Sequence, residues 1–570
     1  MNFFGKAMNF LILNCLAAYG NHNRKRYISM SKKADFYNEK FLMKQLKCSK
    51  NTEYGKKYGF ADIHSVSDFQ NKVPLSTYDD YKPYVDRMVQ TGEQGLLTGN
   101  KVDYFSKTSG TIKVMKMIPT VKGSYTHYIR SCSIILANLK TELKRKNRFI
   151  RYGRGMNLIE SGGETTPSGI KTGYVSGYGM GRALAFAKYI TCLPTEVLGC
   201  TEPIDMKYVK ARYALQDGDL TYLMSVFMSA LTDMIAYIIE NHEILIDDIE
   251  KGVINSSVVM PKQIRSKLEK QLSPDPKRAA ELRKVFSYGS NEGIIPKIWK
   301  NMALIIGIGA GEFAPFTQKM RYYAGKDIAF HYVIYAASEG MIATVINANE
   351  EDYMMLPDSG FFEFLPENDE NAHPLLLNQL EAGKKYELII TNEAGLYRYC
   401  LKDVVAVTGF RGKSPLIRFA YRKEQVINLA GLHMTMEHTT ETIRLLEKAL
   451  HTNINDYSLY ADNDHIPGRI VLFIETEDEI SDESAEKLPQ LFDSILAEVN
   501  VDYTHLQAEC GDIAPSMVYV MKKGTYKEIR EKKIQSGIAV NQIKSLRVIR
   551  SKEQFAEMVA KSEKIKNTVH

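Results

Sequence analysis

The stretch AFHYVIYAASEG, residues 329–340, joins an apolar run to a polar Ser-Glu pair. The run over residues 329–335 is typical of a buried strand, and so is a second run over residues 303–307. Helical patterns alternate with such runs, among them residues 124–143 and 220–240. Strands that alternate with helices predict an α/β fold. Because ligands collect at the carboxyl ends of strands in open α/β sheets, the Ser-Glu pair marks a candidate site.

The character of the chain changes after residue 428. Before this point, three more strands are predicted, over residues 386–391, 397–399 and 404–408. Beyond it, the sequence predicts a separate α+β unit in which residues 453–467 form a polar loop. We place a hinge at residues 421–424, so that a large domain (1–421) precedes a smaller one (422–570). The length of 570 residues agrees with two domains, because single cores rarely exceed about 250–300 residues.

The N-terminal region is predicted to be helical. Residues 10–18 form an apolar run that imitates a signal peptide, but a polar residue interrupts it and a basic segment follows. We therefore expect a first helix that packs on the body of the protein. An amphipathic helix is predicted over residues 30–58. Ser76 or Thr77 is expected to cap a helix over residues 78–88.

The composition excludes several classes of protein. The net charge of +7 comes from 74 basic and 67 acidic residues that are dispersed along the chain. The densest basic cluster, residues 24–26, has no aromatic platform beside it, so we expect no nucleic-acid partner. Polar residues interrupt the apolar residues 222–240, and we expect no membrane span. Seven cysteines without metal-type spacing favour a cytoplasmic location and argue against a zinc site.

A loop rich in hydroxyl groups follows a strand predicted over residues 102–105. It consists of Thr108, Ser109, Gly110 and Thr111, with Lys113 and Lys116 downstream. Such hydroxyl and backbone N–H groups can wrap phosphate oxygens, and glycine lets the backbone approach them closely. For this segment alone, a hairpin loop with hydroxyl turn residues is the alternative. The next strand is predicted over residues 114–118, ended by Pro119.

Two further segments supply complementary chemistry. Ser338 and Glu339 place a hydroxyl donor beside a hard oxygen ligand for Mg²⁺, and the ring of Tyr335 can stack on adenine. Asp403 is expected at a strand end, where its carboxylate accepts two hydrogen bonds from a ribose diol. The alternatives are a capped helix start for the Ser-Glu pair and a solvated turn for Asp403. An enzyme that joins a carboxylic acid to ATP needs all three kinds of binding.

The chain resembles the Gretchen Hagen family, the acyl acid–amido synthetases of plants and their bacterial relatives, among which we expect a bacterial member. The ordered blocks are KNTEYGKKYGF (50–60), VPLSTYDDYKPYVDRM (73–88), YFSKTSGT (104–111), IWKNMALIIGIGAGEFAPF (298–316), YAASEG (335–340), FFEFLP (361–366), YELIITNEAGLYRYCLKDVVAVTGF (386–410) and KKGTYKEI…GIAVNQIKSLR (522–547). The resemblance runs nearly end to end. It implies a large adenylate-forming N-terminal domain with mixed β-sheets flanked by helices, and a smaller, mobile α+β C-terminal domain.

The resemblance also implies roles for individual residues. In similar synthetases the SGT loop holds the ATP phosphates, the YxxSE block holds adenine and the α-phosphate, and the block ending in Asp holds ribose. The nucleotide-binding residues implied here are Thr108, Ser109, Gly110, Thr111, Lys116, Gly309, Tyr335, Ser338, Asp403 and Arg422. Glu339 is implied as the magnesium ligand and a catalytic residue. Lys544 is implied as the catalytic lysine that reaches the α-phosphate.

The sequence departs from the family pattern at four positions. Ile112 and Lys113 stand where the loop usually carries a small hydroxyl residue and a glycine. Lys402 replaces the glycine before the aspartate, and Leu546 replaces a proline. Lysine adds positive charge near a polyphosphate but restricts the backbone geometry that glycine permits.

The resemblance implies a ligase that uses ATP and Mg²⁺. It would convert a small carboxylic acid to acyl-AMP and then transfer the acyl group to an amine, with an amino acid as the expected acceptor. Two alternatives stay open: a catalytically degenerate nucleotide- or acid-binding protein of the same family, and an acyl ligase that forms a thioester. The sequence identifies neither the acid, nor the amine, nor the oligomeric state.

Overall fold

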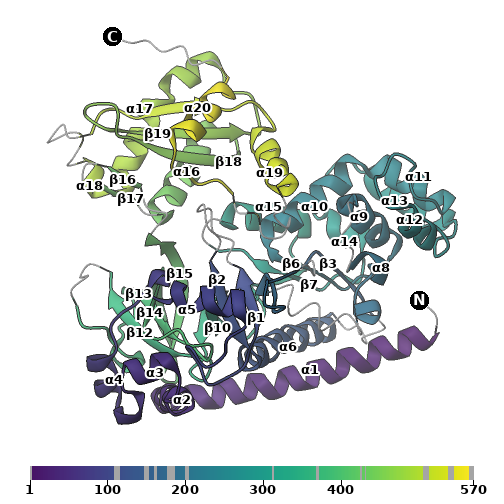
Figure 1. Cartoon of the computed structure of the whole chain (residues 1–570). Helices are drawn as coiled ribbons and strands as arrows, with labels where there is room; N and C mark the ends of the chain where they lie inside the picture. The colour runs from purple at the N-terminus through teal and green to yellow at the C-terminus, as the bar shows by residue number, and fades with distance from the viewer. Residues whose placement is uncertain are drawn as a thin grey trace. The chain divides into compact units, whose positions relative to one another are not determined.

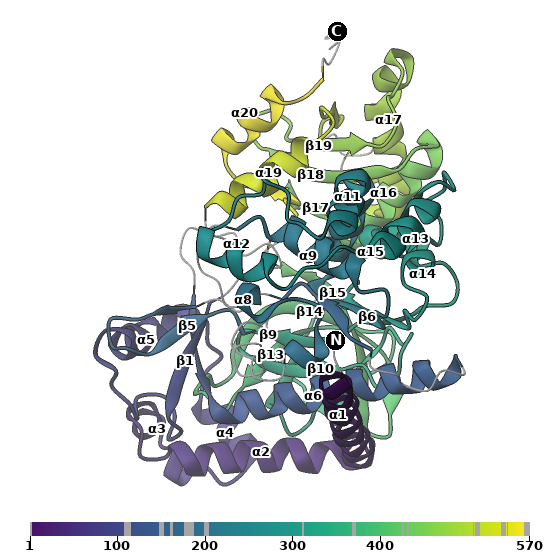
Figure 2. The same cartoon turned by 90° about the vertical axis from the view of Figure 1, so that its right-hand side faces the viewer.

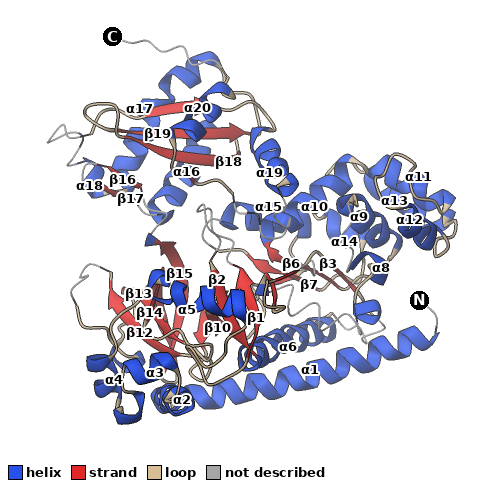
Figure 3. Cartoon of the chain, in the orientation of Figure 1, coloured by secondary structure: helices blue, strands red, loops and turns tan. Residues whose placement is uncertain are grey.

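The chain folds as two compact units in its computed structural model (Figure 1). One unit consists of Met1–Leu401 and Ala406–Arg418, and the other of Lys402–Val405 and Phe419–His570. The structure describes residues 3–107, 116–146, 153–159, 163–175, 187–198, 204–310, 313–367, 372–423, 427–429, 432–434, 436–504, 507, 513–536, 543 and 545–563. Helices and several sheets occur together, which confirms the predicted α/β class (Figure 3). Within these ranges, no helix has the length and apolar character that a membrane span requires.

Helices precede the first strand: α1 (Phe3–Ser31), α2 (Ala34–Ser49), α3 (Glu53–Lys57), α4 (Val66–Lys72) and α5 (Tyr78–Thr91). The predicted first helix is confirmed as α1, whereas the single helix predicted over residues 30–58 is wrong. It is interrupted because the Thr52 hydroxyl accepts a hydrogen bond from the Gly55 N–H at 2.9 Å and so begins a new helix. Thr77 begins α5 as predicted, and its N–H donates to the Asp80 carboxylate at 2.8 Å.

Helix α1 packs along α6 (Lys122–Arg145), which confirms the helix predicted over residues 124–143 (Figure 2). The two backbones approach closely at Gly20, where a Cβ atom would lie 1.9 Å from the Ser133 carbonyl oxygen. Only glycine permits this approach. Nearby, the Asn23 amide donates to the Ser133 hydroxyl at 3.2 Å. The N-terminal helix is therefore an integral part of the first unit.

The first sheet has the strand order β2-β1-β5-β4. Its strands are β1 (Val102–Lys107), β2 (Met117–Val121), β4 (Glu164–Thr165) and β5 (Lys171–Gly173). The strand predicted over residues 102–105 is confirmed. Pro119 was predicted to end the next strand, and this prediction is wrong, because Pro119 lies inside β2. Because β2 is at the edge of this sheet, a residue without an N–H is tolerated there.

The second sheet is parallel and has the order β3-β6-β7-β8. Its strands are β3 (Gly155–Asn157), β6 (Tyr222–Phe227), β7 (Leu304–Ile308) and β8 (Ala329–His331). The strand predicted over residues 303–307 is confirmed as β7. The helix predicted over residues 220–240 is wrong in its first part, which forms β6 and leads directly into α10 (Met228–Glu240). A mostly buried strand between two neighbours has no period that distinguishes it from a helix.

The chain around these parallel strands also forms α8 (Thr195–Leu198), α9 (Met206–Gln216), α11 (His242–Lys251), α12 (Lys262–Glu269), α13 (Pro276–Phe286), α14 (Ile294–Ile298) and α15 (Ala314–Ala324). Strands β6 and β7 are thus joined through a long helical segment, as parallel neighbours require.

The third sheet has seven strands in the order β12-β13-β14-β15-β11-β10-β9. They are β9 (Ile334–Ala337), β10 (Gly340–Thr344), β11 (Tyr353–Met355), β12 (Phe361–Pro366), β13 (Lys385–Thr391), β14 (Tyr399–Arg411) and β15 (Ser414–Arg422). The strand predicted over residues 386–391 is confirmed as β13. The two strands predicted over residues 397–399 and 404–408 are one strand in the structure. β14 includes residue 399 and all of residues 404–408.

The strand predicted over residues 329–335 is wrong, because it is divided between two sheets. β8 ends at His331 in the parallel sheet, and β9 begins at Ile334 in the seven-stranded sheet. Val333 turns the chain between them with a φ of 58°, an unusual value for a β-branched residue. Its N–H donates to His331 Nδ1 at 3.1 Å, which stabilises this turn.

The second unit contains a sheet of order β20-β19-β18-β21. Its elements are β16 (Ile427–Leu429), β17 (Leu432–Met434), α16 (Met436–Leu450), β18 (Ile454–Asp462), β19 (Arg469–Thr476), α17 (Asp482–Val499), α18 (Val501–Thr504), β20 (Met517–Val520), α19 (Thr525–Gln535), β21 (Val548–Ile549) and α20 (Lys552–Ala560). The loop predicted over residues 453–467 is wrong, because β18 occupies most of it. Successive residues of β19 enter two different cores, Leu472 one and Phe473 the other, so both faces of the sheet are covered.

Candidate active site

Ser338 and Glu339 form the two-residue turn between β9 and β10. Ala337 and Gly340 pair across the antiparallel ladder on either side of them. The alternative of a capped helix start is therefore wrong. A two-residue turn presents both polar side chains at the end of the hairpin, and both residues are half-buried.

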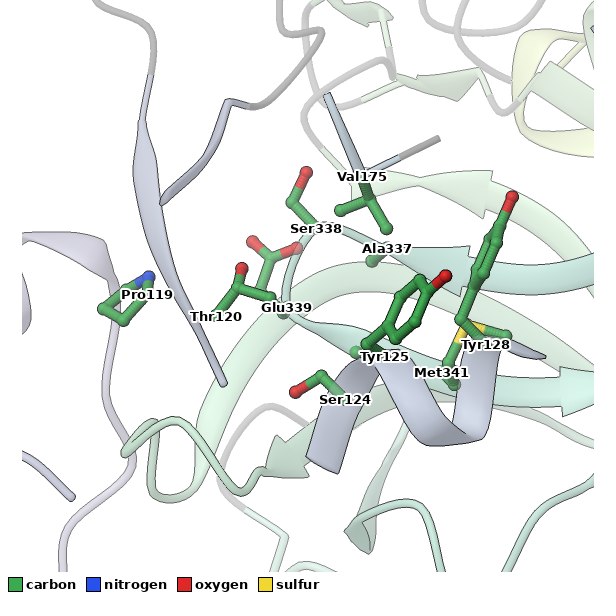
Figure 4. Close-up of a pocket in the computed structure, with 11 residues that line it drawn as sticks. Pro119, Thr120, Ser124, Tyr125, Tyr128, Val175, Ala337, Ser338, Glu339 and Met341 are labelled. Atoms are coloured by element: carbon green, nitrogen blue, oxygen red, sulfur yellow. The ribbon is translucent and has the colours of Figure 1, made fainter. Parts of the chain in front are cut away.

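A pocket of about 420 Å³, which includes some open solvent, lies over this turn. Ser338 and Glu339 line one side of it, and Tyr125 and Tyr128 line the other side from α6 (Figure 4). Thr120 of β2 contributes a further hydroxyl group near Glu339 (Figure 4). The pocket thus joins a polar wall to an aromatic wall within the first unit.

The Ser338 hydroxyl donates to the carbonyl oxygen of Lys107 at 3.3 Å. Lys107 is the last residue of β1 and directly precedes the hydroxyl-rich loop. The tertiary structure therefore brings the Ser-Glu turn next to the start of this loop. The loop residues Thr108, Ser109, Gly110 and Thr111, with Ile112 and Lys113, lie outside the described part of the chain.

Among the described residues that line the pocket, Glu339 carries the one carboxylate, and none is basic. Burial raises the pKa of the Tyr128 hydroxyl well above its usual range and raises the pKa of the nearby Cys132 thiol to about 12, so that wall stays neutral. A carboxylate repels a polyphosphate unless a cation lies between them.

This donor set fits Mg²⁺ bound together with a nucleotide. Mg²⁺ commonly takes one or two carboxylates and completes its shell with substrate phosphates and water. In the described part of the chain, no group of three or more His, Cys, Asp or Glu side chains could hold a metal by itself.

Three other predicted residues of the first unit have clear local settings. The Tyr335 ring lies 6.2 Å from that of Tyr353, on the strand that leads into the Ser-Glu turn. The Lys116 ammonium lies 5.7 Å from the centre of the Tyr78 ring, just before β2. Gly309 follows β7, and a Cβ atom there would lie 2.3 Å from the Thr317 hydroxyl oxygen. Close packing by itself accounts for the glycine at this position.

The sequence analysis missed Asn392, which contacts the Ser-Glu turn from the end of β13. Its side-chain Nδ2 donates to the Glu339 carbonyl oxygen at 2.6 Å. Its Oδ1 accepts hydrogen bonds from the N–H groups of Ala394 and Leu396, at 3.0 and 2.9 Å. The sequence TNEAG carries the signal of an Asn-initiated turn, but it contains nothing that points to Glu339.

In the second unit, Asp403 and Arg422 form an ion pair. The Arg422 Nε donates to Asp403 Oδ1 at 2.6 Å, and the two side chains are 32% and 5% exposed, respectively. Asp403 lies within β14 and not at a strand end, and the alternative of a solvated turn is also wrong. A carboxylate offers about four acceptor positions, so the bond from Arg422 does not by itself occupy all of those of Asp403.

Two departures from the family pattern, Lys402 and Leu546, lie in the second unit, and Lys402 directly precedes Asp403. Lys402 has a φ of 63°, the left-handed conformation that favours glycine, so the backbone keeps the glycine geometry with a lysine in place. Leu546 is buried, as are Ile543 and Arg547. Lys544 lies outside the described residues.

The family models match most of the chain. Residues 23–328 match the GH3 family N-terminal domain, residues 353–422 the GH3 family central domain, and residues 435–553 the GH3 family C-terminal domain.

Similar proteins agree with these matches. The chain is 26% identical to indole-3-acetic acid-amido synthetase GH3.3 of Arabidopsis thaliana, over 91% of this chain and 90% of that protein. It is 27% identical to jasmonoyl-L-amino acid synthetase GH3.5 of Oryza sativa subsp. japonica, over 89% and 91% of the two chains. The solved structure of GH3.15 acyl acid amido synthetase has the same fold, with a TM-score of 0.83 at 20% identity over 94% and 95% of the two chains. The chain therefore belongs to the GH3 family, which confirms its resemblance to the Gretchen Hagen family.

Proposed function

We propose that this chain is an ATP-dependent acyl acid–amido synthetase. The carboxylate of a small organic acid attacks the α-phosphorus of ATP, the bond to the departing pyrophosphate breaks, and acyl-AMP forms. An amine, with an amino acid as the expected acceptor, then attacks the acyl carbon, loses a proton and releases AMP. The observation that carries this proposal is the Ser338–Glu339 turn, which lines a pocket and contacts the strand that leads into the hydroxyl-rich loop.

In this proposal, each predicted site residue binds one part of the nucleotide or the reacting phosphate. Thr108, Ser109, Gly110 and Thr111 bind the phosphates, and Lys116 and Gly309 also belong to the nucleotide site. Tyr335 stacks on adenine, and Ser338 binds the α-phosphate. Asp403 and Arg422 hold the ribose. Lys544 stabilises the charge that develops on the α-phosphate. No covalent enzyme intermediate is required, because acyl-AMP is itself the activated acyl group.

Glu339 is the residue that would hold Mg²⁺. The ion would supply charge neutralisation, which lets an anionic carboxylate approach an anionic phosphate. The place of Glu339 in the pocket wall, beside the Ser338 hydroxyl, supports this role.

The proposal includes a mobile smaller domain, residues 422–570, beside the larger domain of residues 1–421. Its movement would exclude water from the hydrolysable adenylate before the amine reacts. A bacterial origin fits the identity of only 26–27% to the two plant relatives above. A cytoplasmic location fits the free state of the five cysteines that the structure describes.

The proposal is tested by pyrophosphate release from the purified protein with ATP and Mg²⁺. Pools of aryl, indolyl and aliphatic acids are screened with and without mixed amino acids. We expect acid-dependent release that rises with amines and is abolished by Glu339→Ala or Asp403→Ala. The controls Glu381→Ala and Glu483→Ala remove exposed carboxylates from the first and second units and should retain activity. Full turnover by both site variants would refute the assignment.

One observation favours a second function, that of a nucleotide- or acid-binding protein without chemistry. Lys402 occupies a left-handed position that favours glycine, next to a residue assigned to ribose. This function predicts ATP binding by calorimetry without pyrophosphate release from any acid pool. Release that rises with a thiol and not with amines would instead identify the thioester-forming ligase.

A further inference from the structure

We propose that Asn392 is a positioning residue, which orients the Glu339 carboxylate so that it can bind Mg²⁺. The side-chain amide of Asn392 holds the backbone of Glu339 and so fixes where its carboxylate enters the pocket. This inference rests on the proposed function, because that function assigns Glu339 to Mg²⁺ and ATP.

The Asn392 amide connects two turns that the strand order keeps apart. β13, which precedes Asn392, and β9, which precedes the Ser-Glu turn, are separated by four strands in the sheet. The two turns nevertheless meet, since a Cβ atom at Gly340 would lie 3.1 Å from Ile390 Cδ1. The bond from Asn392 Nδ2 to the Glu339 carbonyl oxygen, at 2.6 Å, joins them directly.

Both ends of the Asn392 side chain are engaged in this connection. The residue is only 4% exposed. Its Oδ1 accepts from two N–H groups of its own turn, which fixes the orientation of the amide and leaves Nδ2 to face Glu339. A carboxylate at residue 392 could keep the two accepted bonds but could not donate to Glu339.

The turn that carries Asn392 is fixed by contacts of the next residue, Glu393, with Thr98, Asn100 and His127. The Glu393 carbonyl oxygen accepts hydrogen bonds from the Thr98 hydroxyl at 2.9 Å and from the Asn100 amide at 3.1 Å. The Glu393 carboxylate lies 3.5 Å from His127 Nε2 and fills the space where a Cβ atom at Gly123 would stand. Gly123 belongs to the first turn of α6, which also supplies the aromatic wall of the pocket. The support is therefore rigid, and the bond constrains Glu339 more than it constrains Asn392.

The expected loss of Mg²⁺ affinity without this bond can be judged from other hydrogen-bonding groups that orient metal ligands. Their removal typically lowers metal affinity or activity by about 10- to 100-fold, although they never touch the ion. Glu339 is half-buried in a two-residue turn, so rotation of its peptide group moves the carboxylate relative to the pocket.

The test compares Asn392→Asp with the matched control Asn38→Asp. Asn38 is also buried, at 3% exposure, donates to the Gly360 carbonyl oxygen at 2.7 Å and accepts from the Phe362 N–H at 3.2 Å. Both substitutions therefore replace a buried donating amide by a carboxylate of the same shape. These bonds of Asn38 go to Gly360 and Phe362 at the start of β12 and not to the Ser-Glu turn, so its variant reports the structural cost. Asn392→Ser, which removes the long donor without adding charge, serves if Asn392→Asp does not fold.

The readout is the binding of α,β-methylene ATP as a function of Mg²⁺ concentration, followed by calorimetry and thermal shift. We expect the Asn392 variant to need about 10-fold more Mg²⁺ for half-maximal binding, while Asn38→Asp lowers thermal stability and keeps the wild-type Mg²⁺ requirement. In turnover, the KM for Mg²⁺·ATP should rise in parallel. In a Glu339→Gln background, the Asn392 substitution should have no further effect on the Mg²⁺ requirement, because the two residues act in series.

Three results would overturn the inference. An unchanged Mg²⁺ requirement in the Asn392 variants, with active wild type, would overturn it and leave the proposed function standing. A full additional shift in the Glu339→Gln background would show that Asn392 acts elsewhere. A wild-type protein that binds the analogue without any dependence on Mg²⁺, or not at all, would overturn both the inference and the proposed role of Glu339.

Discussion

Two arginine–carboxylate pairs, one in each unit, differ in the burial of their side chains. Arg398 donates through Nε and Nη2 to the Glu363 carboxylate at 2.9–3.2 Å, and the two side chains are 5% and 1% exposed. Its Nη1 also donates to the carbonyl oxygens of Gln70 and Val73, at 2.7 and 2.8 Å. Arg422 donates to the Asp403 carboxylate, and its side chain is about one third exposed.

The difference in burial indicates which of the two arginines is accessible to a ligand. Arg398 belongs to the GLYRY block, yet its donors are used within the fold, where they tie β12 to the C-terminal end of α4. The neighbouring Tyr397 ring stacks on Tyr54 with 5.1 Å between centroids, which anchors the same block. Membership in a family block therefore does not imply contact with substrate. The Arg422 side chain is partly exposed, at 32%, and is the better candidate for the ribose.

The largest effect is expected for Arg398→Leu. It leaves the Glu363 carboxylate buried without its cation, and breaking a buried pair in this way costs about 3–5 kcal/mol of unfolding free energy. Chemical denaturation measures this loss. The control Arg283→Leu, which removes an exposed arginine that pairs with Glu250, should change stability little. Equal denaturation midpoints for the two variants would contradict the structural role of Arg398.

Arg422→Leu should act on catalysis more than on stability. A hydrogen bond from a charged donor is worth about 1.5–3 kcal/mol, so kcat/KM for ATP should fall about 10- to 100-fold. The protein should remain folded at the assay temperature, as judged by circular dichroism. Steady-state pyrophosphate release provides the rate. A loss of stability as large as that of Arg398→Leu would remove the distinction between the two pairs.

Replacement of each arginine by lysine sharpens the comparison. Arg398→Lys loses the planar fork that meets one carboxylate and two carbonyl groups, and we expect a cost of about 1–3 kcal/mol in unfolding free energy. Arg422→Lys keeps a positive charge beside Asp403 and should retain most of the activity. Denaturation and turnover are measured on both variants. The comparison fails if lysine is tolerated at residue 398 and abolishes activity at residue 422.

The smallest effect is expected for Lys402→Gly, next to Asp403. The left-handed conformation of Lys402 costs about 1–2 kcal/mol for a residue with a Cβ atom, part of which is offset by the extra freedom of glycine when unfolded. We expect a gain of about 1 kcal/mol in unfolding free energy. Lys385→Gly, at the start of β13, lacks this strain and should destabilise the protein. A large increase in turnover with Lys402→Gly would show that the lysine limits catalysis as well as stability.

Local signals were sufficient where an element forms from its own residues. Thr77 and Asp80 form a capping box within one turn of helix, and the apolar run of β7 is short and bounded, so both elements were predictable. The Ser-Glu pair was likewise predicted at a strand end, although its conformation as a hairpin turn was not.

Local signals failed where distant parts of the chain decided the structure. The apolar residues 220–240 divide into β6 and α10 because the parallel sheet accepts a strand between β3 and β7. Residues 329–335 divide between two sheets at Val333, whose positive φ no propensity predicts for a β-branched residue. In both cases hydrophobicity indicates burial but does not specify the neighbour.

The sequence by itself determined the family, the α/β class and the residue types that can bind phosphate, magnesium and ribose, because these depend on ordered blocks and on side-chain chemistry. Only the tertiary structure decided which of those residues meet. The Asn392 bond to Glu339 spans 53 positions of sequence, and the Arg398–Glu363 pair spans 35. Such contacts form only after sheets and loops have closed, and their partners are specified by burial and hydrogen-bond geometry that no single segment contains.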